Sequence, residues 1–189
     1  MAAEDGSFVD KVWCNVWQTW MVDVTVSVDE FNADFADLFC EEDGMKKGVL
    51  LLRIASVLAL VHGVLHTIGG VFGSVAPGAM QTAVTAMQTN RFEAMGGNRS
   101  YWDFFMGYGL LTTVKFLVET VVFWQLASLL KAYGLQVRPL LIAFCVGYVA
   151  DAFIAWRYFF AGPAVFEIVI AGCLFWAWWL AGRTASRAV

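Results

Sequence analysis

The sequence is short of charged residues, proline and cysteine, and these shortages exclude several classes of protein. Only 15% of the residues are charged, whereas about 25% is usual in soluble globular domains. The 4 cysteines form no C-x-x-C pair, so neither a disulfide framework nor a zinc site is predicted. The chain also lacks a P-loop, a nucleophile elbow and a GxGxxG motif, and nothing in it supports nucleic-acid binding.

The sequence is instead rich in long runs of apolar residues. Hydrophobic residues make up 60% of the chain, and its mean hydropathy is +0.66. A helix needs about 20 apolar residues to cross a hydrocarbon core of roughly 30 Å. Four runs meet this length: residues 48–71, 104–130, 138–160 and 163–182. Because lipid cannot hydrogen-bond an exposed backbone and four spans cannot close a barrel, the sequence predicts an all-α, multi-pass bundle of four transmembrane helices.

Charge divides the chain into two parts, residues 1–44 and residues 45–189. The first part carries 11 acidic residues against Lys11 alone, while the second carries 11 lysines and arginines against 5 acids. Two interpretations of residues 1–44 remain open. They are either an acidic N-terminal extension or the product of a start codon placed too far upstream, since Met45 followed by two lysines resembles the start of a small membrane protein.

Basic residues at the ends of the predicted spans indicate the orientation of the chain. With a cytoplasmic N-terminus, six of them fall on the cytoplasmic side and three at or beyond the outer face. The six are Lys46, Lys47, Lys131, Arg138, Arg183 and Arg187, and the three are Arg91, Arg99 and Arg157. This excess predicts that both termini are cytoplasmic. The one long connection, residues 74–102, then lies outside, and its segment 77–95 is expected to form a helical cap over the bundle.

Ionisable side chains within the predicted spans cost roughly 2.5–3.5 kcal/mol each on insertion scales, so they are the candidates for a functional site. Their depths, taken at about 1.5 Å per residue from the middle of each span, predict two layers. The midplane layer holds His62, Lys115, Glu119 and Asp151, and the outer layer holds His66, Glu167 and Arg157. Lys115 and Glu119 are one helical turn apart and are expected to pair.

Two interpretations of these layers remain open. In the first, the groups neutralise one another as ties between helices, which is a common way for membrane helices to associate. In the second, they line a small polar cavity that opens outward beneath the cap, where they bind a ligand or relay protons.

His62 and His66 are also the candidate metal ligands, with Glu119 or Asp151 as a third. A haem held by both histidines is excluded within one chain, because one helix cannot approach it from opposite faces. The sequence identifies no cofactor.

Several short motifs stand out from Met45 onward. They are HTIGG at 66–70, Arg91-Phe92, Met95-Gly96, RSYWDFF at 99–105 with Gly107 and Gly109, and WRYFF at 156–160. In these motifs the chain resembles a family of small, uncharacterised bacterial four-helix membrane proteins and, more loosely, DoxX-like membrane proteins. The resemblance covers most of residues 45–189, implies the bacterial plasma membrane, and brings no known activity. It points to a group of residues near the outer face: His66, Arg99, Tyr101, Trp102, Asp103 and Arg157.

These observations lead to two functional hypotheses. The first is a non-enzymatic membrane protein, either an accessory subunit or a small-ligand binder or transporter with a polar cavity. The second is a membrane-embedded redox or metal-dependent enzyme that uses His62 and His66. Besides the lipid bilayer, the expected partners are further copies of this chain or a larger membrane complex, because four spans are few for a self-sufficient transporter.

Overall fold

The computed structural model describes residues 44–186, so the predicted acidic extension lies outside the described residues except for Gly44. The described chain is mostly helical. Three stretches of helix are long and apolar enough to cross a membrane, namely Gly44–Val71, Tyr101–Tyr158 and Ala161–Arg183. The second stretch contains two α-helices joined by a turn, so the described residues form four long helices.

The long helices follow the apolar runs closely. They are α3 (Gly44–Leu65, extended by the π-helix η1, His66–Val71), α5 (Tyr101–Tyr133), α6 (Arg138–Tyr158) and α7 (Ala161–Ser186). The 3₁₀ turn η2, Gly134–Val137, joins α5 to α6. Gly134 ends α5 with a φ of +51°, and Pro139 occupies the first turn of α6, where no backbone hydrogen bond is lost.

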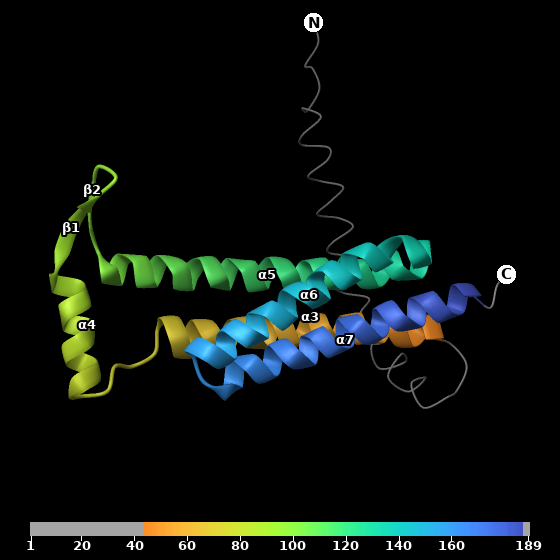
Figure 1. The fold of residues 1–189 in the computed structure, drawn as a ribbon, viewed down its shortest axis with the longest axis horizontal. Helices are drawn as coiled ribbons and strands as arrows, with labels where there is room; N and C mark the ends of the chain where they lie inside the picture. The colour runs from red at the N-terminus through yellow and green to blue at the C-terminus, as the bar shows by residue number, and fades with distance from the viewer. Residues whose placement is uncertain (1–43, 187–189) are drawn as a thin grey trace, which may run out of the picture.

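The four helices form an antiparallel bundle with one open side. α3 packs against α5 and α7, and α7 packs against α6, whereas α5 and α6 make few close backbone contacts beyond their connecting turn. Figure 1 shows the start of α3, the turn η2 and the end of α7 together at one end of the bundle, here called the Gly44 end. At the other end, here called the hairpin end, α5 extends beyond α6 and α7 (Figure 1).

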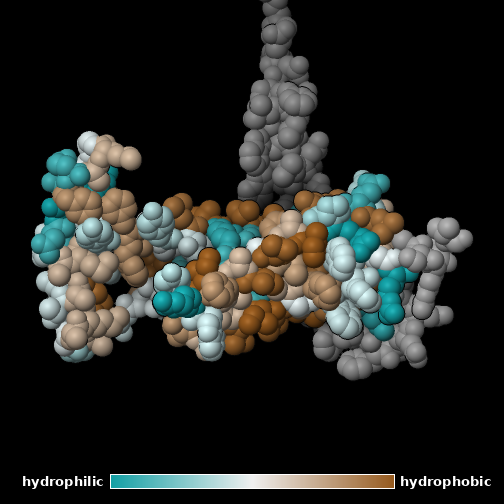
Figure 2. All heavy atoms as spheres, viewed as in Figure 1, coloured by the Kyte–Doolittle hydropathy of each residue, from teal (hydrophilic) through white to brown (hydrophobic). Residues whose placement is uncertain are grey.

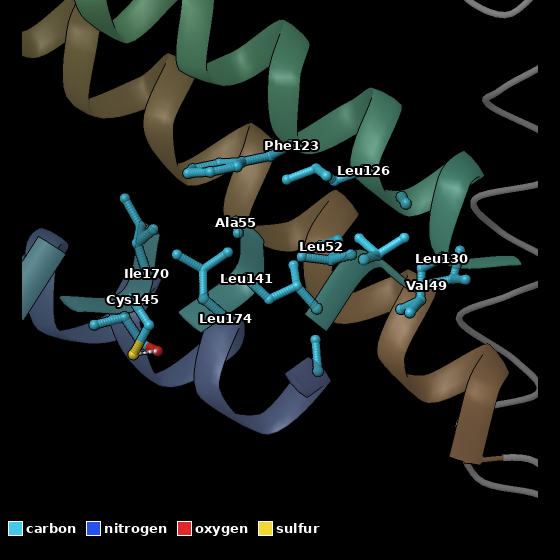
Figure 3. Packing of buried hydrophobic residues seen from close by; sticks show 14 of the residues in the cluster. Val49, Leu52, Ala55, Phe123, Leu126, Leu130, Leu141, Cys145, Ile170 and Leu174 are labelled. Carbon is cyan, nitrogen blue, oxygen red and sulfur yellow. Dashed lines mark hydrogen bonds between the residues drawn. The ribbon is translucent and has the colours of Figure 1, made fainter. Parts of the chain in front are cut away.

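Buried apolar side chains fill the part of the bundle nearer the Gly44 end. Leu52, Phe123, Leu141 and Leu174, one from each long helix, are fully buried and converge in the same core (Figure 3). In the same view the Cys145 thiol donates to the carbonyl oxygen of Ala171, across α6 and α7, at 3.5 Å. The apolar core therefore occupies the half of the bundle nearer the Gly44 end, and the polar side chains of the bundle lie nearer the hairpin end.

The connection between α3 and α5 differs from the single helix expected over 77–95. Helix α4 covers Ala79–Thr89, but the strands β1 (Arg91–Ala94) and β2 (Gly97–Ser100) then form an antiparallel hairpin. Met95 and Gly96 make its turn with φ of +47° and +82°, a combination that matches the twist of a two-residue hairpin. The helical prediction is therefore wrong beyond Thr89. In Figure 1, α4 lies across the hairpin end, roughly perpendicular to the long helices.

Large hydrophobic side chains cover the outside of the helices. Examples are Val61, Leu117, Val146 and Ile168, one on each long helix, all of them exposed. Figure 2 shows hydrophobic residues gathered over the middle of the bundle and hydrophilic residues concentrated toward its two ends. A soluble protein rarely exposes apolar patches of this extent, whereas a helix that faces lipid does so along its length.

Candidate functional site

An ion pair joins α5 to α6 on the open side of the bundle. Lys115 Nζ lies 2.5 Å from Asp151 Oδ2 and 3.6 Å from Glu119 Oε1. The Tyr148 hydroxyl donates to Glu119 Oε2 at 2.8 Å. The predicted pairing of Lys115 with Glu119 is confirmed, and Asp151 is the closer partner of the lysine. These four residues are called the charged cluster below.

The charged cluster lines a hollow of about 200 Å³ between α5 and α6. Its remaining walls are Ala143, Phe144 and Gly147 of α6. The side chains of Lys115 and Asp151 are 43% and 37% exposed, so the rest of the described chain leaves this pair partly uncovered. The hollow therefore opens on the side of the bundle, between the two helices, whereas the sequence predicted a cavity that opens outward beneath the cap.

A second polar pair lies between α3 and α7. His62 Nδ1 is 3.4 Å from Glu167 Oε1, and both residues are buried. The imidazole ring packs against two phenyl rings, with its centroid 4.4 Å from that of Phe116 and 5.0 Å from that of Phe166. His62 Nδ1 and Glu167 Oε2 are buried without a hydrogen-bond partner in the part of the chain that the structure describes. A carboxylate oxygen without a partner is costly at such a site.

The two polar pairs lie at one level of the bundle. At 1.5 Å per residue, Asp151 is about 10 Å from the end of α6 at Tyr158, and Glu167 is about 9 Å from the start of α7 at Ala161. Lys115 also interacts electrostatically with Glu167 across the bundle. The prediction that Glu167 shares a layer with His66 is wrong, because the carboxylate pairs with His62 instead.

His66 and Arg157 lie closer to the hairpin end and outside this group. His66 Nε2 is 3.1 Å from the carbonyl oxygen of Gly109, on the neighbouring helix α5. The Arg157 guanidinium lies on the surface, 5.2 Å from the ring of Tyr158. Neither residue joins Glu167, so the predicted outer layer is not formed as a unit.

The other residues to which the resemblance points lie around the junction of the hairpin with α5. The Ser100 side chain accepts from the Asp103 backbone N–H at 3.2 Å, and Asp103 Oδ2 accepts from the Ser100 N–H at 2.8 Å. Further contacts in this region are Arg99 to the Asn98 carbonyl, Tyr101 against Phe92, and Trp102 against Phe105. Tyr101 is about 21 Å along α5 from Lys115, so this group is separate from the charged cluster.

The structure does not bring the predicted metal ligands together. Within residues 44–186, no three His, Cys, Asp or Glu side chains form a group that could hold a metal ion. His62 faces Glu167, while His66 faces the backbone of α5. A third ligand from Glu119 or Asp151 is also absent from this arrangement, because both carboxylates contact Lys115.

Three aromatic residues of the site were missed by the sequence prediction. Tyr148 is the partner of Glu119, and Phe116 and Phe166 enclose His62. Tyr148 had a signal, since it precedes Asp151 by three residues and therefore shares a face of α6 with it. Phe116 and Phe166 had no such signal in the sequence, because an apolar helix contains many aromatic and aliphatic residues that could equally face a histidine.

No protein-family model, no curated protein and no solved structure matches this chain. The resemblance to small bacterial four-helix membrane proteins and to DoxX-like proteins therefore stays a prediction. The function has to be argued from the geometry of the bundle.

Proposed function

We propose that this chain is a multi-pass protein of the bacterial plasma membrane, with four transmembrane helices and both termini in the cytoplasm. Each long helix contains one of the four apolar runs. The start of α3 and the end of α7 lie at the same end of the bundle (Figure 1), as an even number of spans requires. Lys46, Lys47, Lys131 and Arg183 also lie near this end, and a basic end is typical of the cytoplasmic side.

We infer that the protein is not an enzyme and that it binds a small ligand at the charged cluster, directly from the bilayer. One observation carries this inference: the Lys115–Asp151 ion pair lines a hollow that is open on the side of the bundle. A charged side chain within the membrane costs roughly 2.5–3.5 kcal/mol on insertion scales. An ion pair that served only as a tie between helices would avoid this cost best by being fully covered, and it would need no hollow beside it.

The alternative, a redox or metal-dependent enzyme that uses His62 and His66, has less support. His62 faces Glu167 while His66 faces the carbonyl oxygen of Gly109, and no group of three potential metal ligands is found within residues 44–186. A bound ligand therefore accounts better for the geometry than a metal centre built on this pair.

The test is to fill the hollow. Native mass spectrometry of the full chain in detergent would be recorded with three dodecyl probes that differ only in head group: dodecylamine, dodecanoate and dodecanol. Gly147 has open space at its Cβ position within the hollow, so Gly147→Leu is expected to abolish stoichiometric binding of any probe that the wild type binds.

Gly107→Leu is the matched control. Gly107 on α5 has equally open space, but it does not line the hollow. It should leave probe binding unchanged. If none of the three probes binds the wild type, or if both leucine variants bind equally well, the proposed ligand site does not exist.

A further inference from the structure

The charged cluster has an excess of acid. It holds two carboxylates, those of Glu119 and Asp151, against the single ammonium group of Lys115, and Glu167 of the neighbouring pair also acts on this ammonium electrostatically. Asp151 and Glu119 contact it directly, at 2.5 and 3.6 Å. The basic residue His62 of α3 is buried against Glu167 rather than against Lys115. The electrostatic field in the hollow therefore favours a cation over an anion.

Aromatic rings complete a site for an ammonium group. Lys115 Nζ lies 5.5 Å from the ring centroid of Phe116 and 5.6 Å from that of Tyr148. Both distances are within the range in which a ring attracts a cation. Carboxylates and aromatic rings together are a combination that holds ammonium groups, and here the group that they hold belongs to the protein itself.

Lys115 is placed so that it can leave this site. Its side chain is 43% exposed and has a flexible four-carbon stem, so the ammonium can move outward while the stem stays on α5. Beside it, Gly147 leaves open space at the mouth of the hollow. The neighbouring outer surface is apolar, with Val118 of α5 and Val146 of α6 both exposed, so an alkyl chain can lie along it.

We propose that the ligand is an amphiphilic amine, whose ammonium group binds between Asp151, Glu119, Phe116 and Tyr148 and whose alkyl chain stays in the lipid, and that Lys115 is the resident cation that it displaces. This inference rests on the proposed function, since it names the chemical class of the ligand of the same hollow. It assigns Lys115 the role of a competitor of the ligand and not that of a binding group.

Replacing Lys115 tests the inference, because only a competitor of the ligand gives tighter binding when it is removed. Binding of dodecylamine to the full chain would be measured by native mass spectrometry and by isothermal titration calorimetry at a fixed detergent concentration. If Lys115 occupies the site for about nine-tenths of the time, Lys115→Gln should tighten dodecylamine binding about tenfold. Asp151→Asn should weaken it by a similar factor, because the nearest carboxylate is lost.

The matched controls change charge elsewhere. Lys131→Gln at the Gly44 end and Glu93→Gln in β1 make the same changes of charge far from the hollow, so both should bind dodecylamine like the wild type. Circular dichroism and thermal unfolding would verify that each variant folds. Should Lys115→Gln fail to fold, Lys115→Met, which keeps most of the apolar stem, gives the same comparison.

Four outcomes would overturn the inference. Unchanged or weaker dodecylamine binding by Lys115→Gln would show that Lys115 does not compete with the ligand. Tighter binding of dodecanoate than of dodecylamine by the wild type would make Lys115 a binding group for an anion, and the proposed ligand site would survive without this ligand class. A dimer that excludes all three probes and dissociates in Lys115→Gln would assign the hollow to a second copy of the chain. Binding of no probe by any variant would end the proposed function as well.

Discussion

His62 Nδ1 lies 3.4 Å from Glu167 Oε1, and this contact links α3 to α7 in the interior of the bundle. The imidazole packs against Phe116 and Phe166, and the second carboxylate oxygen of Glu167 has no hydrogen-bond partner within residues 44–186. The Lys115–Asp151 pair between α5 and α6 is partly exposed on the side of the bundle, whereas the His62–Glu167 pair is buried. These two pairs therefore have different physical roles.

The buried pair is expected to lower the stability of the bundle. Replacing a buried ion pair by apolar residues of similar volume is often neutral or stabilising by about 1–4 kcal/mol. The double variant His62→Phe/Glu167→Met should therefore unfold at the same or a higher temperature in detergent. His62→Phe alone should be destabilised by about 3 kcal/mol, because it leaves the carboxylate of Glu167 buried without the imidazole that it contacts.

Thermal unfolding followed by circular dichroism measures both variants. A double variant that is clearly less stable than the wild type would show that the polar pair contributes net stability. The single variant serves as the reference, because it separates the loss of the pair from the loss of packing around the ring.

The positions of the four helices could be predicted from the sequence, but the level of the buried pair could not. The length of an apolar run fixes a helix to within a few residues, as α3, α5, α6 and α7 show. The depth of a residue in the membrane is harder to predict, because misplacing a helix by one turn shifts the depth by about 5.4 Å. Helix α3 begins at Gly44, four residues before the predicted span 48–71. The middle of the helical stretch is therefore earlier in the chain than predicted, and His62 lies further from it, toward the hairpin end.

Among the contacts of the site, those within one helix could be predicted from the sequence and those between helices could not. Lys115 and Glu119 lie on one helix, so their contact follows from spacing alone. The contacts of Lys115 with Asp151 and of His62 with Glu167 join different helices, and they depend on rotations about the helix axes that the sequence does not specify. The hairpin was missed because its strands are only four residues long, although Gly96-Gly97 is a turn signal.

The Lys115–Asp151 pair is expected to contribute a modest coupling energy between α5 and α6. Interhelical polar pairs in membrane proteins contribute about 0.6 kcal/mol on average and about 1.7 kcal/mol at most. A double-mutant cycle of Lys115→Met and Asp151→Leu should give a coupling within this range, measured as free energies of unfolding in mixed micelles. A coupling of several kcal/mol would instead make the pair a structural tie and would weaken the case that Lys115 can be displaced.

Gly63 is expected to be essential for the close packing of α3 on α5. A Cβ atom at this position would lie 2.8 Å from Phe116 Cβ, which is attached to the backbone and cannot move away by rotation of the side chain. Gly63→Ala should therefore lower the free energy of unfolding by about 1–3 kcal/mol. Gly107→Ala is the control, because nothing lies within 4 Å of its Cβ position and alanine favours a helix by up to about 1 kcal/mol. Equal stabilities of the two variants would contradict the close contact.

The capping box at Ser100 and Asp103 is expected to fix the start of α5. Each side chain accepts a hydrogen bond from the backbone N–H of the other residue. Ser100 is buried, so Ser100→Ala should cost about 1 kcal/mol and increase hydrogen exchange in the first turn of α5. Exchange at η2, at the opposite end of the same helix, is the internal control. Unchanged exchange in the first turn would mean that the packing of Phe92 on Tyr101 and Phe104 holds the helix start without the cap.

The proposed topology places the hairpin and η2 on opposite sides of the membrane. Helix α5 separates them by 33 residues, or about 50 Å, which exceeds the thickness of a hydrocarbon core. In a variant without the four native cysteines, Met95→Cys and Gln136→Cys would each be treated with a membrane-impermeant maleimide on intact bacterial cells. Both positions are exposed, so accessibility to the reagent depends on the side of the membrane alone. We expect labelling of Met95→Cys in intact cells and of Gln136→Cys only after permeabilisation. The reverse pattern would invert the orientation that the basic residues at the Gly44 end indicate, and labelling of both positions from outside would show that α5 does not cross the membrane.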